Sequence, residues 1–230
     1  MAAPRYSPVG HELLDDPGAD PRKVTTSLGN IARANRWFGG CAAVRYGLDR
    51  LLDGVPAGRT LTLLDIGTGS GDLPQDAMRW AAGRGVHLVP VGLERSRTAA
   101  SLARATSLPT VVGCASALPF GDRTFDLVLM SQVAHHLAAD AAVELFRAAA
   151  RVARVGVVVA DLRRARLAQL LFDVGARLLR FDQVTRVDGI TSIARGYRPA
   201  ELAALAARAG VQAHVEARPG WRVVAWWRTA

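Results

Sequence analysis

Short apolar runs alternate with segments of helical periodicity through the middle of the chain. Strands that alternate with helices favour parallel pairing through right-handed crossovers. The alternation therefore predicts a mostly parallel sheet. The expected strands lie at residues 61–65, 86–93, 110–112, 125–130 and 155–160, and the expected helices at residues 72–82, 97–106 and 139–152.

The C-terminal part of the chain has a different pattern. A helical segment over residues 199–209 is followed by two apolar strands, at residues 211–217 and 222–227. Only a short link containing Pro219-Gly220 separates these two strands. A link of this length predicts an antiparallel hairpin.

Two helices are expected ahead of the first strand. Residues 24–52 have helical periodicity that is broken at Gly39-Gly40. Residues 1–23 hold four prolines and no periodicity, which predicts a flexible arm.

Residues 163–198 interrupt the alternation with a stripe of apolar residues at helical spacing. We interpret this stripe, and the aromatic Trp37 and Phe38 near the other end of the chain, mainly as core-facing helix surfaces. The alternative is that both flanks cover a bound apolar molecule. The stripe consists of Leu167, Leu170, Leu171, Val174 and Leu178.

The composition indicates a globular protein, since half of the 230 residues are apolar and 21% are charged. The two cysteines, Cys41 and Cys114, exclude a disulfide framework and a cysteine-rich zinc site. No apolar run reaches the roughly 18 residues that a membrane helix needs. No secretory signal is recognised, so we expect a cytoplasmic protein.

A glycine-rich turn follows the first expected strand, in the order Asp65-Ile66-Gly67-Thr68-Gly69-Ser70-Gly71-Asp72. Glycines let the backbone turn sharply and let a ligand approach closely. The spacing differs from that of dinucleotide sites and phosphate loops. Glu94 ends the second strand, where an acidic side chain beside such a turn can accept ribose hydroxyls. Together these residues predict a nucleotide-like ligand.

Three segments (63–72, 91–94 and 114–137) resemble class I S-adenosylmethionine (SAM) dependent methyltransferases. The resemblance is strongest to the small-molecule branch, which includes ubiquinone, menaquinone and natural-product O- and C-methyltransferases. It implies a Rossmann-like, doubly wound α/β fold with seven strands, mostly parallel with a C-terminal antiparallel hairpin. It also implies an N-terminal helical extension over residues 1–57 and a domain over residues 58–230. A helical lid insertion at about 163–198 follows the fifth strand.

The resemblance also implies a cofactor site. Gly67, Gly69 and Gly71 would line the methionine part of SAM, and Asp65 would hold its amino group. Cys114 stands where the family usually has an Asp, and because a thiol is a poor acceptor, adenine recognition is expected to shift toward neighbouring groups. The full expected set is Asp65, Gly67, Thr68, Gly69, Gly71, Asp72, Glu94 at the ribose, Arg95 beside the adenine, Cys114, Ala115, Ser116 and Ser131.

The acceptor side is expected at His135-His136, which follow the fourth strand and so face the cleft. A neutral histidine can take the proton of a phenol, whose pKa is near 10. The other reading is that both histidines pack or cap. Asp161 ends the fifth strand, where it could orient a cleft histidine, bind the acceptor or cap the next helix. The histidines form no ligand cluster in the sequence, so no metal is expected.

These residues predict a SAM-dependent methyltransferase that acts on a hydrophobic, phenolic or polyketide-like small molecule. O-methylation is favoured and ring C-methylation is the near alternative, with His135, His136, Trp37 and Phe38 contacting the acceptor. The net charge of +9 motivates an RNA methyltransferase as another alternative, but no [DN]PP[YF] motif supports it, so no nucleic acid is expected. A non-catalytic SAM-binding partner protein also stays open.

Two further expectations concern association. A basic amphipathic helix over residues 166–180 would allow peripheral contact with an anionic membrane. The chain is expected to be a monomer or a homodimer.

Overall fold

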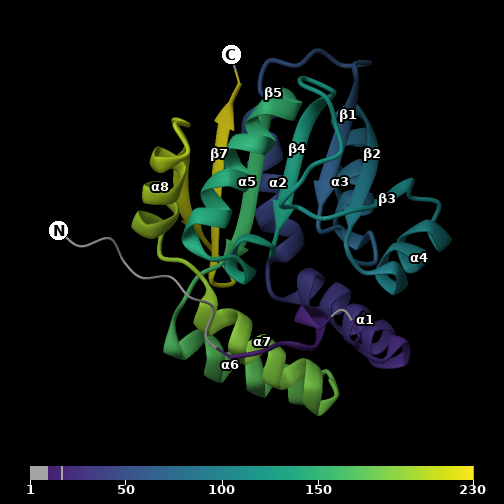
Figure 1. Cartoon of the computed structure of the whole chain (residues 1–230), viewed down its shortest axis with the longest axis vertical. Helices are drawn as coiled ribbons and strands as arrows, with labels where there is room; N and C mark the ends of the chain where they lie inside the picture. Colours follow the sequence, from purple (N-terminus) through teal and green to yellow (C-terminus); the bar gives the residue numbers. More distant parts are fainter. Residues whose placement is uncertain (1–9, 17, 230) are drawn as a thin grey trace.

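A seven-stranded sheet with helices on both faces forms the body of the protein in the computed structural model, which describes residues 10–16 and 18–229 (Figure 1). The strand order is β3-β2-β1-β4-β5-β7-β6. Strands β1 to β5 are parallel, and β7 runs antiparallel to both β5 and β6. The expected doubly wound fold with a C-terminal antiparallel hairpin is confirmed. The strands are β1 (Thr60–Ile66), β2 (His87–Glu94), β3 (Thr110–Val112), β4 (Phe125–Ser131), β5 (Ala153–Leu162), β6 (His214–Arg218) and β7 (Arg222–Arg228).

The central strands are continuous apolar runs because helices cover both of their faces. Helices α2 and α3 pack against one face, where Leu63, Leu127 and Val158 are buried. Helices α5 and α8 pack against the other face, over Leu64 and Val128. The helices are α1 (Pro21–Trp37), α2 (Gly40–Leu52), α3 (Asp72–Ala82), α4 (Arg97–Ala105), α5 (Ala139–Val152), α6 (Arg166–Leu178), α7 (Gln183–Arg195) and α8 (Pro199–Arg208).

Helices α1, α6 and α7 gather at the end of the sheet where the parallel strands finish (Figure 1). Helix α6 follows β5, and α7 packs against both α6 and α1. The expected helical insertion after the fifth strand is therefore a helical hairpin, and it closes this end together with α1. In an open parallel sheet, this end is where ligands bind.

The structure corrects the expected arm over residues 1–23 in its described part. Helix α1 begins at Pro21, because the Asp20 carboxylate accepts a hydrogen bond from the Arg22 N–H and proline suits the first helical position. A short 3-10 helix, η1 (Leu13–Asp15), precedes it, and the neighbouring Glu12 is buried. Residues 1–9 and 17 lie outside the described residues.

The structure also corrects the start of the first hairpin strand. Residues 209–211 complete the end of α8: the Gly210 N–H bonds to the Ala207 carbonyl and the Val211 N–H to the Ala206 carbonyl. Gly210 has a φ of +78°, and this pair of bonds is the Schellman ending of a helix. Val211 therefore belongs to the helix end, and β6 begins only at His214.

A third correction concerns the apolar stripe of α6, which we interpreted as core-facing. Its five members are 44–78% exposed, while the helix buries the smaller Ala168 and Ala176. The periodicity therefore identified the helix and the stripe, but the stripe faces outward.

Candidate functional site

A cavity of about 1060 Å³ lies at the carboxyl end of the parallel strands. Ligand pockets typically measure roughly 300–1000 Å³, so this cavity has room for more than one small molecule. Its walls come from the turns after β1, β2 and β4, from α1, and from the α6–α7 hairpin. Of the predicted site residues, the cavity is lined by Trp37, Phe38, Gly67, Thr68, Gly69, Asp72, Glu94, Arg95, Cys114, Ala115, Ser131, His135 and His136.

The glycine turn contributes two of its three glycines to the cavity wall. Gly67 and Gly69 have φ values of +72° and +56°, which side chains rarely permit. A Cβ on Gly67 would lie 2.5 Å from the Val133 side chain. Gly71 instead caps the N-terminus of α3 in the left-handed conformation and does not line the cavity.

Three acidic side chains surround this turn. Asp65 is buried beneath it, and its carboxylate accepts a hydrogen bond of 2.7 Å from the Thr68 hydroxyl. Burial raises the pKa of Asp65 to about 7, and the negative charges of Asp72 and Glu94 act in the same direction. Burial also raises the pKa of Asp72. The turn therefore favours a ligand that carries positive charge.

Glu94 holds the turn in place. One carboxylate oxygen accepts from the Gly69 N–H at 2.9 Å, and the other accepts from the Ser96 N–H at 2.8 Å. A carboxylate has about four lone-pair sites, so it keeps acceptor capacity toward the cavity after making these two bonds.

The segment after β3 has the residues expected beside an adenine ring. Cys114 and Ala115 line the cavity, whereas Ser116 does not. The Ser116 hydroxyl donates to the Cys114 sulfur at 3.1 Å and lowers the pKa of the thiol. Arg95 lines the cavity, and its guanidinium donates to the carbonyls of Leu14 and Asp15 at 3.0 and 3.2 Å.

His135 and Asp161 form a buried pair at the other side of the cavity. The Nδ1 atom of His135 lies 2.6 Å from one Asp161 carboxylate oxygen, and the backbone N–H of His135 donates to the other oxygen at 3.2 Å. Burial alone would raise the pKa of Asp161, but His135 and the Leu162 N–H hold it below its ordinary value. An ionised Asp161 requires the Nδ1–H tautomer of His135, which leaves Nε2 as an acceptor. Within the described residues Nε2 is buried and has no hydrogen-bond partner.

The structure contradicts the helix-capping reading of Asp161. Helix α6 begins after Ala165 and has no side-chain cap. The Asp161 carboxylate instead contacts His135 and the Leu162 backbone N–H.

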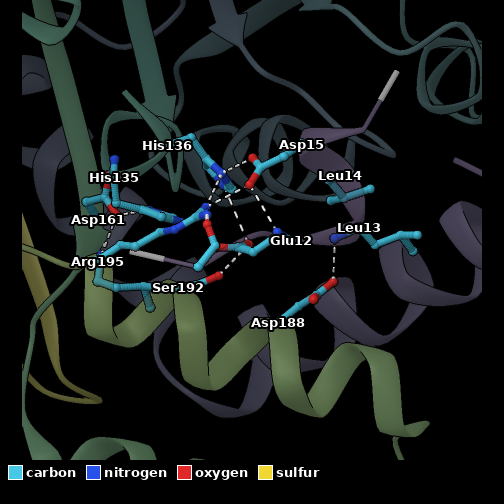
Figure 2. A network of polar contacts seen from close by, with 12 residues as sticks. Glu12, Leu13, Leu14, Asp15, His135, His136, Asp161, Asp188, Ser192 and Arg195 are labelled. Atoms are coloured by element: carbon cyan, nitrogen blue, oxygen red, sulfur yellow. Dashed lines mark hydrogen bonds and ion pairs between the residues drawn. The ribbon is translucent and has the colours of Figure 1, made fainter. Parts of the chain in front are cut away.

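His136 belongs to a second polar cluster, shown in Figure 2. Its Nδ1 atom lies 2.9 Å from an Asp15 carboxylate oxygen, and this hydrogen bond lowers the pKa of Asp15. Arg195 of α7 is buried and donates to Glu12 at 2.8 Å and to Asp15 at 3.0 Å. Burial raises the pKa of Glu12. The rings of His135 and His136 lie 4.2 Å apart, so the two clusters meet in the cavity wall.

Glu12, His135 and His136 have ligand atoms within 4.8 Å of one another, a spacing that suits a metal ion. The Arg195 guanidinium also lies in this cluster, 2.8 Å from Glu12 and 3.3 Å from His136 Nδ1. Its charge opposes a second cation at this position. We therefore assign no metal to the cluster.

Trp37 and Phe38 line the cavity from the end of α1. Phe38 packs edge-on against Phe172 of α6 with ring centres 5.5 Å apart, and Trp37 is 69% exposed. The buried Arg222 donates to the Phe38 carbonyl at 3.1 Å and so fixes the turn between α1 and α2.

The sequence analysis did not identify several residues of this site. Glu12 and Asp15 lie in the segment expected to be flexible, and Arg195 is separated from Glu12 by 183 positions. Asn35 connects the two sides of the cavity, since its amide donates to Asp72 at 3.0 Å and accepts from Gln132 at 2.6 Å. No local sequence signal points to these contacts, because each joins segments that are far apart in the chain.

The chain is similar to known methyltransferases in sequence and in fold. Residues 64–160 match a family model described as a methyltransferase domain. No curated protein sequence matches the chain.

Several solved methyltransferases have a similar fold. Magnesium protoporphyrin IX methyltransferase from Synechocystis, with bound S-adenosylhomocysteine (SAH), is 14% identical with a TM-score of 0.56, over 84% of each chain. A putative O-methyltransferase from Nostoc punctiforme is 16% identical with a TM-score of 0.58, over 86% of this chain and 59% of that one. A chain in the complex of the Haloferax volcanii Trm112 activator with a putative methyltransferase is 17% identical with a TM-score of 0.58, over 96% and 99%.

The matched domain covers β1 to β5, and with them the glycine turn, the end of β2 and the turn after β4 that line the cavity. The strand number and directions are those that the resemblance implied. Residues 64–160 therefore form a methyltransferase domain, and solved methyltransferases with bound SAM or SAH share the fold of this chain.

Proposed function

We propose that this methyltransferase transfers the methyl group to a hydroxyl oxygen of a hydrophobic, phenolic or polyketide-like small molecule. The observation that carries the proposal is the His135–Asp161 pair. Asp161 fixes one ring nitrogen at 2.6 Å, and the other nitrogen is buried without a partner among the described residues. A histidine held in this way is suited to accept a proton from an acceptor hydroxyl.

The residues at the glycine turn suit SAM. SAM supplies a methyl group on a positively charged sulfonium, and its amino group adds a second positive charge. Asp65, Asp72 and Glu94 provide negative charge at the turn. Gly67 and Gly69 would lie against the methionine part, and the free lone pairs of Glu94 would accept the ribose hydroxyls. Cys114, Ala115 and Arg95 would flank the adenine.

His135 would remove the acceptor proton during transfer. The oxygen–carbon bond forms as the sulfur–carbon bond breaks, and the phenolic proton moves to Nε2 of His135. Asp161 stabilises the imidazolium that results, because its carboxylate lies 2.6 Å from Nδ1. Trp37, Phe38 and Phe172 would pack against the flat apolar part of the acceptor and exclude water.

Ring C-methylation uses the same base, because a phenolate is also nucleophilic at the ring carbons beside and opposite its oxygen. The cavity supports both outcomes. The product therefore decides between them.

A screen of hydroxylated aromatic acceptors tests the proposal. With SAM and a panel of alkylated mono- and dihydroxybenzenes, we expect turnover and formation of SAH, and a methoxy carbon signal in the product when the methyl group of SAM is ¹³C-labelled. A methyl signal on a ring carbon would assign C-methylation. SAM binding without turnover of any phenolic acceptor would contradict the proposed substrate class.

The affinity for SAM should depend on the ionisation of Asp65. Because the pKa of Asp65 is about 7 in the free protein, the carboxyl is mostly protonated at pH 6 and must ionise to hold a cationic ligand. We expect the Kd of SAM to fall about eightfold between pH 6 and pH 7.5, as measured by calorimetric titration. The stability of the fold has the opposite pH dependence. Because the pKa of Asp65 is higher in the folded protein than in the unfolded chain, the free energy of unfolding falls as the pH rises from about 4 through 7.

Two controls isolate this effect. Asp65→Asn should bind SAM with little pH dependence over the same range. Adenosine, which has neither the sulfonium nor the amino group, should bind the unaltered protein equally at both pH values. If Asp65→Asn keeps the eightfold change, a different group controls SAM binding.

A further inference from the structure

Helix α6 presents its large apolar side chains to solvent, and this arrangement is the reverse of an ordinary surface helix. Leu167, Leu170 and Leu178 are 55%, 60% and 78% exposed, and Leu171 and Val174 are also exposed. The opposite face is packed through the small side chains of α6, Ala168 and Ala176. A contiguous exposed apolar patch usually marks an interaction surface.

The exposed stripe adjoins the cavity. Leu171 lies on the stripe and also lines the cavity. Trp37 of α1 lines the cavity as well and is 69% exposed, and Val187 of α7 is 52% exposed. Helices α1, α6 and α7 occupy the same end of the molecule in Figure 1. The exposed apolar surface and this part of the cavity wall therefore belong to one end of the protein.

Positive charge accompanies this stripe. Residues 163–198 contain eight arginines, three aspartates and no glutamate or lysine. Arg166, Arg177 and Arg180 are exposed. Arg177 shares the Asp173 carboxylate with Arg186, at 2.9 and 2.8 Å, so this group of three keeps a net positive charge. At about 100° per residue, Arg166 and Arg177 both lie on the same border of the stripe, where a headgroup phosphate would meet them.

We propose that α6 docks the protein on the surface of an anionic lipid bilayer. The apolar stripe enters the interfacial region, the arginines bind lipid phosphates, and the cavity wall that Leu171 and Trp37 line faces the bilayer. No helix among residues 10–16 and 18–229 is long and apolar enough to cross a membrane, so the contact is peripheral. A second copy on the same face would bring like arginines together, which disfavours self-association there.

Flotation with lipid vesicles tests the proposal on the protein alone, so the result does not depend on methyl transfer. We expect the protein to float with vesicles of phosphatidylcholine and phosphatidylglycerol (7:3) at 50 mM NaCl. With phosphatidylcholine vesicles, or at 500 mM NaCl, we expect binding to fall at least tenfold, because each arginine near the surface contributes about fivefold.

Paired variants locate the surface. Leu170→Gln/Leu178→Gln removes apolar area from the stripe and should lower the partition coefficient at least tenfold. Arg166→Gln/Arg177→Gln should lower it about 25-fold. Met78→Gln, on the 38%-exposed Met78 of α3, is the matched control and should bind as the unaltered protein does. Unchanged SAM affinity in each variant shows that the fold is kept.

Three results would overturn the proposal. The first is no flotation with anionic vesicles at low salt, and the second is equal binding to neutral and anionic vesicles. The third is a dimer in sedimentation velocity that Leu170→Gln/Leu178→Gln converts to a monomer, which would assign the stripe to a contact between two copies.

Discussion

Replacing His135 with asparagine should lower kcat for a phenolic acceptor by roughly 10²–10⁴-fold, the usual contribution of a general base. The unpartnered Nε2 atom of His135 is lost, while the Asp161 carboxylate remains in place. The SAM affinity should stay the same, because the side chain of His135 is held by Asp161 and not by the residues of the glycine turn. Steady-state kinetics and calorimetric titration measure the two quantities.

His136→Asn is the matched control. His136 lies beside Asp15 and Arg195 and serves the cluster that holds η1, so we expect its kcat to fall by less than tenfold. If His136→Asn loses activity and His135→Asn keeps it, the two histidines have the opposite roles. If neither variant falls by more than about tenfold, no histidine acts as the base.

Asp161→Asn tests the positioning role of the carboxylate. An amide can donate to Nδ1 and so favour the wrong tautomer of His135, which lowers kcat while both side chains remain. A nitrophenol that is already ionised at the assay pH needs no base, so it should restore turnover in both Asp161→Asn and His135→Asn. A purely structural role of Asp161 would leave the nitrophenol as slow as any other acceptor.

The sheet could be predicted from the sequence because each of its signals is local. The strands β1, β4 and β5 are predominantly apolar, and the turn glycines follow β1 directly. The position of Glu94 beside that turn then follows from the parallel pairing of β1 with β2. The glycine turn and Glu94 could therefore be placed together once the strands were predicted.

The orientation of α6 could not be predicted in the same way. Periodicity gives the angular position of Leu170 or Leu178 around the helix axis, but it does not say which side meets the rest of the protein. The packing contacts decide that, and they use the smaller Ala168 and Ala176. A basic helix with an apolar stripe is consistent with a core-facing stripe and with an exposed stripe, and only the structure shows which way the stripe faces.

The contacts of η1 depend on tertiary structure alone. Glu12 and Asp15 have no apolar periodicity around them, and their partners lie in η2 (Ala134–His136) and α7. The segment is ordered because Arg195 and Arg95 bind it from two sides of the cavity. It therefore forms part of the cavity wall.

Replacing Arg195 with methionine should lower the free energy of unfolding by about 3–5 kcal/mol, because it leaves a buried carboxylate cluster without its cation. Arg195 is 6% exposed and donates to Glu12, Asp15 and the Gly10 carbonyl. Urea unfolding followed by circular dichroism measures the change. Arg177→Met, on the same hairpin, removes only an exposed ion pair with Asp173 and should leave the stability nearly unchanged.

The pH dependence of the Arg195→Met loss identifies its cause. The destabilisation should shrink as the pH is lowered from 7 toward 4, because protonation of Glu12, whose pKa is already raised by burial, removes the uncompensated charge. Glu12→Gln/Arg195→Met should regain part of the stability at pH 7 for the same reason. A loss that is equal at pH 7 and pH 4.5 would mean that Arg195 stabilises through packing, and the ionic attachment of η1 to α7 would then contribute little.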